Sequence, residues 1–278
     1  MPELPEVETV ARYLRARVTD ARITVVRVVP HEKWASAATA HGRQLTDIRR
    51  RGKHLLLDLD DGNTLAIHLG MTGVVDLEIA PPRMPGPNLH ERLALRMRTS
   101  DGARWLLRLT DARGFGHAIV APRTRDGEVE LAALHSMGPE PLDGWTWQHL
   151  ARACARRNGP IKAALLDQSV VAGIGNYLAD EILYAARVHP ARSANTLSTR
   201  KLRTLHEKAV AIITKAVDAG GATISDYRHP DGSSGEAQFG LLAYGREGEP
   251  CVRCGRPMSK TVVAGRGTTY CAYCQRRS

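Results

Sequence analysis

Four of the five cysteines lie in the last 28 residues, as two Cys-x-x-Cys pairs separated by sixteen residues. Each pair can place two thiolates on one side of a tight turn, and two such turns complete the tetrahedral sulfur set that Zn²⁺ prefers. The segment between the pairs, MSKTVVAGRGTTY, has the pattern of a β-hairpin. We therefore predict a zinc ribbon over 241–278 that holds one structural Zn²⁺ through Cys251, Cys254, Cys271 and Cys274. Four cysteines leave no open position on the metal for catalysis.

The composition narrows the class of protein further. The 278 residues carry a net charge of +10 and an isoelectric point near 9.7. No apolar run approaches the roughly 18 residues that cross a bilayer, and the acidic start MPELPEVETV has no apolar signal core. These features exclude an integral membrane protein and predict a cytoplasmic one. The basic charge favours a polyanionic partner such as nucleic acid, although a solvated basic surface explains it too.

The N-terminal part, 1–125, has the pattern of an antiparallel β-sandwich behind a leading helix. Apolar residues recur at spacings of three and four over 5–18, which indicates an amphipathic helix with Pro5 at its first position. Short alternating runs with Asp-Gly turns follow. The expected strands are 23–29, 44–48, 54–59, 64–69, 74–79, 92–97, 104–109 and 117–121. The segment 126–145 has the composition of a linker.

Helical periodicity dominates 146–240, where we expect helices over 147–155, 160–167, 176–188 and 199–219. Ser198 is a candidate N-cap, and Cys154 is expected to be an ordinary helix residue. The segment 229–240, HPDGSSGEAQFG, is expected to be a loop.

A glycine-rich turn, AGIGN at 172–176, connects two of these helices. Such a turn can aim backbone N–H groups at a phosphate, next to a helix N-terminus that favours negative charge. Asn176 is also a candidate N-cap. A plain connection between helices has the same appearance, but the nearby Arg157 and Lys162 favour the phosphate-binding interpretation.

The N-terminus offers unusual chemistry. If Met1 is removed, Pro2 becomes a secondary amine that can form a Schiff base with an aldehydic carbon. Glu3 and Glu6 are then placed to act as acid or base. The alternative is structural, because glutamates near a helix start are often capping residues.

Taken together, these motifs resemble the bacterial formamidopyrimidine-DNA glycosylases, with endonuclease VIII as a more distant relative. The matching segments run from end to end of the chain. They are MPELPEVE at 1–8, RGKHLL at 51–56, HLGM at 68–71, PIK at 160–162, LLDQ at 165–168, AGIGN at 172–176, ADE at 179–181, YGR at 244–246 and GRGT at 265–268.

The resemblance implies a monomeric DNA repair enzyme, associated with the bacterial nucleoid, that acts on damaged double-stranded DNA. It would excise oxidised bases, purines above all, and cleave the strand by β,δ-elimination. Motif by motif, Pro2 would be the nucleophile and Glu3 the acid/base, with Lys53 a further catalytic residue. Glu6 would bind the lesion nucleotide. Phosphates would be held by Lys53, His68, Lys162, Asn176 and Arg266, and the gap in the stack would be filled by Met71, Arg113 and Phe115.

The chain departs from the family pattern in the wedge loop, the segment 111–116. The family has Asp-Pro-Arg-Arg-Phe-Gly, and this chain has DARGFG. The segment 229–240, which covers the flipped base in the family, differs as well. Two other functions remain open: a DNA-damage-binding paralogue that does not cut, and an RNA-binding protein with the same helix-two-turn-helix. The N-terminal signature favours the enzyme, with DNA held between the two halves of the chain.

Overall fold

A computed structural model describes residues 2–277 and divides into two compact units. Unit 1 comprises 1–135 and 219–236, and unit 2 comprises 136–218 and 237–278. The predicted segments 1–125, 126–145, 146–240 and 241–278 are not tested by this division and stay predictions. Among the described residues, no helix combines the length and the apolar character needed to cross a bilayer.

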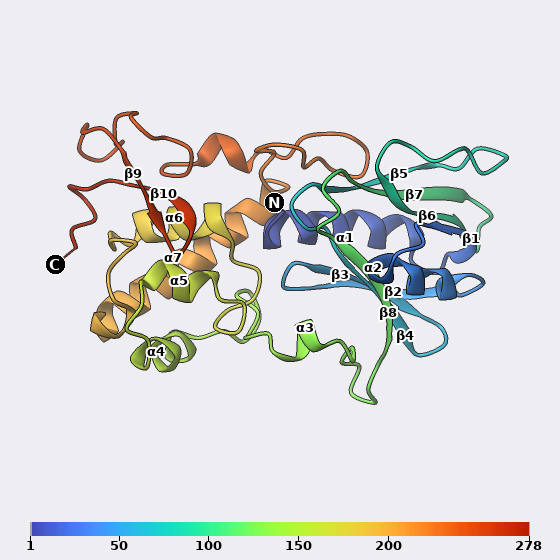
Figure 1. The fold of residues 1–278 in the computed structure, drawn as a ribbon, viewed down its shortest axis with the longest axis horizontal. Coiled ribbons are helices and arrows are strands. Elements are labelled where there is room, and N and C mark those ends of the chain that lie inside the picture. Colours follow the sequence, from blue (N-terminus) through green and yellow to red (C-terminus); the bar gives the residue numbers. More distant parts are fainter. Residues whose placement is uncertain (1, 278) are drawn as a thin grey trace. The chain divides into compact units, whose positions relative to one another are not determined.

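Unit 1 is the predicted antiparallel β-sandwich with a leading helix (Figure 1). Its first elements are α1 (Leu4–Val18), β1 (Arg22–Val28), α2 (Glu32–Ala35), η1 (Ser36–Ala40) and β2 (Leu45–Arg51). The remaining ones are β3 (His54–Leu59), β4 (Asn63–His68), β5 (Gly73–Ile79), β6 (Glu91–Arg98), β7 (Arg104–Asp111), β8 (His117–Pro122) and α3 (Ala132–His135). The periodicity did not reveal α2 or η1, which are each about one turn long.

Two four-stranded sheets make up the sandwich, in the orders β1-β6-β7-β5 and β2-β3-β4-β8. Every pairing in both sheets is antiparallel. β3 is buried along its whole length, because the side chains on both of its faces are covered. The apolar stripe of α1, which includes Val7, Val10 and Leu14, packs into the same core as both sheets. The start of α1 is thereby fixed to the sandwich.

The segment 219–236 belongs to unit 1 although it follows a helix of unit 2. Tyr227 joins the sandwich core, and the N–H of Leu77 in β5 donates to the carbonyl of Pro230 at 2.8 Å. This segment, predicted in part as a plain loop, is therefore an integral layer of unit 1.

Unit 2 holds the predicted helices and the ribbon hairpin. Its elements are α4 (Trp147–Ala155), α5 (Ile161–Leu166), α6 (Asn176–Ala185), η2 (Ala194–Thr196), α7 (Thr199–Asp218), η3 (Ala237–Gly240), β9 (Ser259–Val263) and β10 (Arg266–Tyr270). Ser198 precedes α7, and its hydroxyl accepts from the N–H of Lys201 at 3.4 Å. Cys154 is a buried helix residue, as expected. Asn176 is not the N-cap of α6: Gly175 takes that position, which frees the asparagine side chain for another partner.

Candidate active site and zinc centre

The start of α1 buries two carboxylates side by side. Glu3 and Glu6 are 2% and 1% exposed. Glu6 accepts the N–H of Glu3 at 2.7 Å through Oε2 and the N–H of Ala222 at 2.7 Å through Oε1. Pro2 directly precedes this pair and is buried, while Met1 and its removal lie outside the described residues. One carboxylate therefore orients the backbone beside Pro2 and ties the segment 219–236 to α1.

Gly221 explains how Ala222 comes so close to Glu6. It has φ +77°, and a Cβ at this position would lie 2.9 Å from Glu6 Oε1. Only glycine accepts that backbone conformation without strain. Tyr227 reinforces the same junction, because its hydroxyl donates to the carbonyl of Glu6 at 3.3 Å. Burial, together with the charge of Glu6, raises the pKa of Tyr227 far above its usual value, so its hydroxyl stays a donor.

Three histidines form a ladder across β3, β4 and β8. His54 pairs in register with His68, and His68 pairs with His117. Their ring centroids are 4.8–5.4 Å apart. Both ring nitrogens of His54 and Nε2 of His117 are buried without a hydrogen-bond partner among the described residues. Of these three, the sequence pointed only to His68.

His68 is neutral in this setting. Burial, with the charges of His117 and Lys53, lowers its pKa to about 4, against the opposing effect of Asp111. Its Nδ1 accepts the N–H of Gly70 at 3.1 Å, which leaves the proton on Nε2. His68 can therefore offer a phosphate an N–H donor, without a positive charge. Lys53, 8% exposed at the start of β3, supplies the charge beside it.

The predicted gap-filling residues Met71, Arg113 and Phe115 lie on two loops that are fastened together. Asp111 links the two loops by hydrogen bonds. Its Oδ1 accepts from the Thr72 hydroxyl at 2.6 Å, and its Oδ2 accepts from the N–H of Gly116 at 2.8 Å. The Thr72 hydroxyl also accepts the N–H of Arg113 at 3.2 Å. Neither Thr72 nor Asp111 was predicted as a site residue.

Phe115 projects from this loop, and 52% of it is exposed. The guanidinium of Arg113 lies 4.7 Å from the centre of its ring. Gly70 allows the two loops to touch, because a Cβ there would come within 2.7 Å of the backbone of Phe115. The exposed aromatic ring on this loop is therefore not part of the apolar core. Met71 is half-buried.

Lys162 is enclosed in the interior of unit 2. Its side chain has no exposed surface, and its ammonium lies 2.6 Å from Asp180 Oδ1. It also donates to the Thr268 hydroxyl at 2.8 Å and to the carbonyl of Gly267 at 3.1 Å. In this structure the ammonium is engaged by groups of the protein itself. The resemblance implied that Lys162 holds a phosphate, and that role stays a prediction; the sequence did not indicate that Asp180 is its partner.

The same network fastens the ribbon hairpin to α5 and α6. Asp180 Oδ2 accepts the N–H of Thr269 at 3.0 Å, and Asn176 Nδ2 donates to the carbonyl of Gly267 at 3.0 Å. Two residues that are predicted to bind phosphates, Asn176 and the exposed Arg266, thus lie at the turn of the hairpin formed by β9 and β10. The Lys162–Asp180 pair therefore positions residues at the surface.

Two further polar side chains shape unit 2, and sequence reasoning assigned a role to neither. Glu181 accepts backbone N–H groups from Leu242, Ala243 and Tyr244 at 2.8–3.0 Å. Gln168 closes the glycine-rich turn, because its Oε1 accepts the N–H of Gly173 at 2.8 Å and its Nε2 donates to the carbonyl of Ile174. Their membership of the LLDQ and ADE motifs was the available signal.

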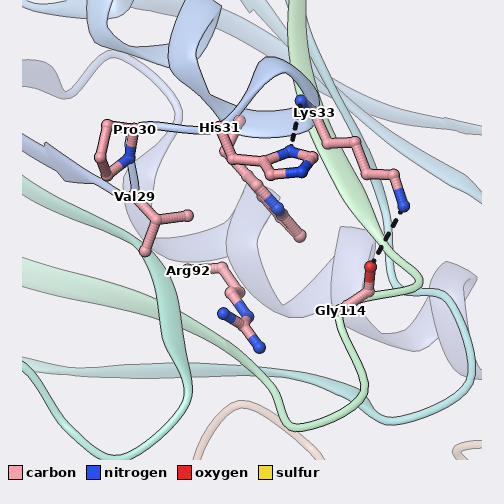
Figure 2. Close-up of a pocket in the computed structure, with 7 residues that line it drawn as sticks. Val29, Pro30, His31, Lys33, Arg92 and Gly114 are labelled. Atoms are coloured by element: carbon pink, nitrogen blue, oxygen red, sulfur yellow. Dashed lines mark hydrogen bonds between the residues drawn. The ribbon is translucent and has the colours of Figure 1, made fainter.

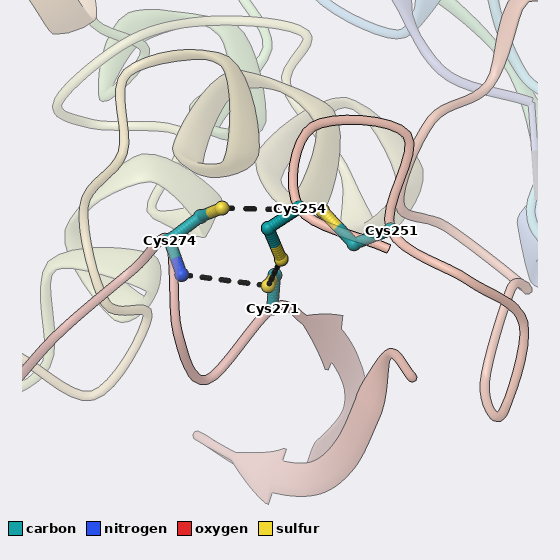
Figure 3. A group of neighbouring side chains, drawn as sticks. All are labelled: Cys251, Cys254, Cys271 and Cys274. Atoms are coloured by element: carbon teal, nitrogen blue, oxygen red, sulfur yellow. Dashed lines mark hydrogen bonds between the residues drawn. The ribbon is translucent and has the colours of Figure 1, made fainter. Parts of the chain in front are cut away.

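The four tail cysteines converge as predicted (Figure 3). Their sulfur atoms all lie within 4.8 Å of one another. The Cys251–Cys274 and Cys254–Cys271 sulfur distances are 4.0 and 3.6 Å. A tetrahedron with Zn–S bonds near 2.3 Å has sulfur–sulfur edges of about 3.8 Å, so the residues fit one Zn²⁺. The set is closed by cysteine alone, which makes the zinc structural.

Comparison with known sequences gives matches along almost the whole chain. The Formamidopyrimidine-DNA glycosylase N-terminal domain matches 1–118, its H2TH domain matches 137–228, and a zinc finger found in FPG and IleRS matches 248–277. The Formamidopyrimidine-DNA glycosylase of Thermus thermophilus is 41% identical over 99% of this chain and 98% of that protein. The one from Roseiflexus is 42% identical over 99% and 100%.

Solved structures agree with these matches. The MutM (Fpg) protein of Thermus thermophilus superposes with a TM-score of 0.89 at 40% identity and covers 100% of both chains. Lactococcus lactis Fpg in complex with DNA that contains an abasic site has a TM-score of 0.88 at 32% identity, covering 99% of each chain. The α+β fold and the zinc ribbon expected from the sequence are confirmed, and the chain belongs to the formamidopyrimidine-DNA glycosylase family.

Proposed function

We propose that the protein is a DNA repair glycosylase with AP lyase activity, which removes oxidised purine bases from double-stranded DNA. Membership of the family supports the glycosylase activity. The observation that carries the proposal is the buried Pro-Glu pair at the start of α1, which is held by Glu6. An amine nucleophile needs a nearby acid that is shielded from water, and Glu3 is 2% exposed.

The chemistry follows from these groups. Once Pro2 is the chain terminus, its nitrogen lone pair attacks C1′ of the damaged nucleotide, the bond from C1′ to the base breaks, and the base leaves with the proton that the amine gives up. Glu3 protonates the ring oxygen O4′, the sugar opens, and an iminium links Pro2 to C1′. Loss of a C2′ proton expels the 3′-phosphate, and a second elimination expels the 5′-phosphate. Lys53 is a candidate for moving one of these protons.

DNA is held by two kinds of contact in this proposal. Lys53 and His68 in unit 1, and Asn176 and Arg266 in unit 2, bind phosphates through a cation or an N–H donor. Lys162 supports the second pair from the interior. An enzyme that acts on a base must first extrude it, and a wedge offsets the lost stacking. Met71, Arg113 and Phe115 form that wedge, and Glu6 contacts the extruded nucleotide after exchanging a backbone N–H partner.

A borohydride trap tests the mechanism. Protein that begins at Pro2 is mixed with a duplex carrying an abasic site in the presence of borohydride, which reduces an iminium to a stable amine. We expect a covalent adduct whose peptide mass places the DNA on Pro2. An adduct on Lys53 would contradict the assignment of the nucleophile. Absence of any adduct, with binding intact, would favour the damage-binding paralogue.

Two variants separate chemistry from binding. Glu3→Gln should bind lesion duplex like the parent yet excise slowly, because the acid acts chiefly in the transition state. Extra residues ahead of Pro2 turn its nitrogen into an amide, so that protein should bind but neither trap nor excise. If it excises at the parental rate, Pro2 is not the nucleophile.

A further inference from the structure

A small pocket lies directly behind the wedge loop 111–116, within unit 1 (Figure 2). It has a volume of about 210 Å³. Val29, Pro30, His31, Lys33, Trp34, Arg92 and Gly114 line it. Two of these side chains are cations that bind carbonyls of the wedge loop, and no role in the proposed chemistry falls to either of them.

The two cations bind backbone carbonyls on either side of the exposed residues Ala112 and Arg113. The ammonium of Lys33 donates to the carbonyl of Gly114 at 3.3 Å, as the dashed line in Figure 2 marks. Arg92 Nε donates to the carbonyl of Asp111 at 2.9 Å. The guanidinium of Arg92 also lies beside Gly114, 3.6 Å from where its Cβ would be. Phe115, the exposed ring, is the residue directly after Gly114.

Both cations stand on rigid supports. Lys33 lies in α2, whose N-cap is His31; the Nδ1 of His31 accepts the N–H of Lys33 at 3.3 Å. The next residue, Trp34, is 3% exposed and belongs to the sandwich core. Arg92 lies in β6, next to the fully buried Leu93. A hydrogen bond to a fixed donor restricts the loop, whereas one to a mobile donor would not.

The loop of this chain needs such restriction. Ala112 stands where the family pattern has proline, and Gly114 stands where it has arginine. Gly114 has φ +65°, a conformation open to glycine at no cost. Loss of a proline and gain of a glycine both enlarge the set of conformations that the free loop can adopt. Without an added constraint, ordering Phe115 against DNA would cost more conformational entropy.

We propose that Lys33 and Arg92 are positioning residues of the wedge: they clamp the carbonyls of Gly114 and Asp111 and so hold Phe115 ready to fill the gap left by the extruded nucleotide. The clamp replaces the stiffness that proline gives the loop in the family pattern. It acts from the interior side of the loop, while Thr72 and the Asp111 carboxylate fasten the other side. This inference rests on the proposed wedge role of Phe115.

A direct phosphate contact by Lys33 would give different behaviour. A phosphate contact carries no information about the base and weakens binding to all DNA alike when it is removed. A clamp acts only through Phe115, so its removal matters only where a gap in a duplex must be filled. Binding to a single strand of the same sequence needs no wedge.

The test compares the affinities for a lesion duplex and for its single strand. Lys33→Met keeps the aliphatic stem and removes the ammonium, and Arg92→Met does the same for the guanidinium. We expect each to weaken duplex binding roughly three- to tenfold, as for the loss of one typical hydrogen bond, and to leave single-strand binding within a factor of two. Lys33→Arg, which keeps a charged donor, should restore most of the duplex affinity.

A double-mutant cycle with Phe115→Ala decides whether the clamp acts through the ring. Lys33→Met should add nothing to the duplex defect of Phe115→Ala if the proposal is right. Independent, additive losses would overturn it, as would equal losses on duplex and single strand. Arg104→Ala is the matched control, because it removes an exposed charge from β7 in the same unit; its losses on the two substrates should be equal.

The outcomes separate this inference from the proposal beneath it. If Phe115→Ala itself shows no preference for the duplex, the wedge role fails and the clamp fails with it. If Phe115→Ala is selective and neither methionine variant is, only the clamp is wrong. Should Lys33→Met fold poorly, Lys33→Gln removes the charge with a shorter polar side chain, and the same selectivity is expected. The borohydride adduct on Pro2 is expected for every variant.

Discussion

The two compact units differ in how some of their buried polar groups are paired. In unit 1 the apolar stripe of α1 packs into the sandwich core, and His54, in the ladder across β3, β4 and β8, is buried without a hydrogen-bond partner among the described residues. Unit 2 buries charges that are fully engaged. Asp180 and Lys162 pair with one another, and the Glu181 carboxylate accepts three backbone N–H groups.

This difference indicates what each unit depends on. The larger core of unit 1 tolerates neutral imidazoles that cost stability when they take up a proton. The ribbon has only a small apolar core around the cysteines. Its stability should therefore depend on metal–sulfur bonds and on the buried Lys162–Asp180 pair. The two units should therefore fail under different treatments, and a treatment that unfolds one of them should spare the other.

Removal of zinc should have the largest effect. Structural zinc in small domains contributes about 10–16 kcal/mol to folding, because the site does not exist in the unfolded chain. Chelation should unfold 241–278 and weaken DNA binding. Hydrogen exchange resolved by peptide should show lost protection in the hairpin 259–270 and unchanged protection in β3 and β4.

Elemental analysis supplies the control, with one zinc per chain expected before chelation and Cys254→Ala expected to lower that content. Unchanged hairpin protection after complete zinc removal would show that the metal is not what orders the tail.

Breaking the buried Lys162–Asp180 ion pair should have the second-largest effect. Lys162→Met leaves the Asp180 carboxylate buried without its counter-ion, which typically costs about 3–5 kcal/mol. Thermal unfolding should show the loss, and exchange should localise it to unit 2. Replacing both residues, with Lys162→Met and Asp180→Leu, should recover part of the stability, since no unpaired charge remains. If the single variant is as stable as the parent, Lys162 is not held in the interior and its assignment to a phosphate contact is favoured.

Acid should destabilise unit 1 first. Burial and the neighbouring histidines lower the pKa of His54 to about 3, and burial, with His117 and Lys53, lowers that of His68 to about 4. Burial and the charge of Lys33 lower the pKa of His117 as well. The unfolded chain binds these protons near pH 6.5 and the folded chain does not. Stability should therefore fall as pH drops from 6.5 towards 4, by about 1.4 kcal/mol per unit for each such histidine.

A variant sharpens the acid prediction. His54→Phe keeps a ring of similar shape and removes two buried nitrogens that lack partners, so it should flatten the pH dependence and stabilise unit 1 by about 1–2 kcal/mol at pH 5. Denaturant titrations at pH 5 and pH 7.5 measure both effects. A pH profile identical to the parent would mean that the ladder does not control acid stability.

Local patterns in the sequence were enough to predict the sandwich, the long helices and the zinc ribbon. Short strand-like runs bounded by turns identified strands such as His54–Leu59, and the cysteine spacing predicted the cluster directly. Short helices such as α2 were not predicted, because four residues are too few to show a helical period. The grouping of 219–236 with unit 1 depends on contacts between segments far apart in the chain, which no local pattern records.

The site was predictable only where a side chain carries recognisable chemistry. Pro2, Glu3 and the cysteines stand out by type and position. The burial of Lys162 against Asp180 could not be predicted, because nothing in the local sequence indicates this pair. Thr72, Lys33 and Arg92 bind backbone groups of the wedge loop from elsewhere in the chain, so these contacts appear only once the fold brings the segments together.

Arg266→Ala should have the smallest effect, and it tests whether the two units also differ in how they bind DNA. Arg266 is exposed at the hairpin turn that Asn176 and Lys162 support, so its removal should leave the fold intact. If it neutralises one phosphate, affinity for damaged and undamaged duplexes should fall alike, and the slope of log K against log salt should become less steep by about one. Titrations at several salt concentrations measure both quantities. Phe115→Ala is the contrasting variant from unit 1, since it should lower affinity for the lesion duplex and leave the salt slope unchanged. If Arg266→Ala lowered the affinity for damaged DNA alone, unit 2 would recognise the lesion as well. The expected contrast between Arg266 in unit 2 and Phe115 in unit 1 would then be wrong.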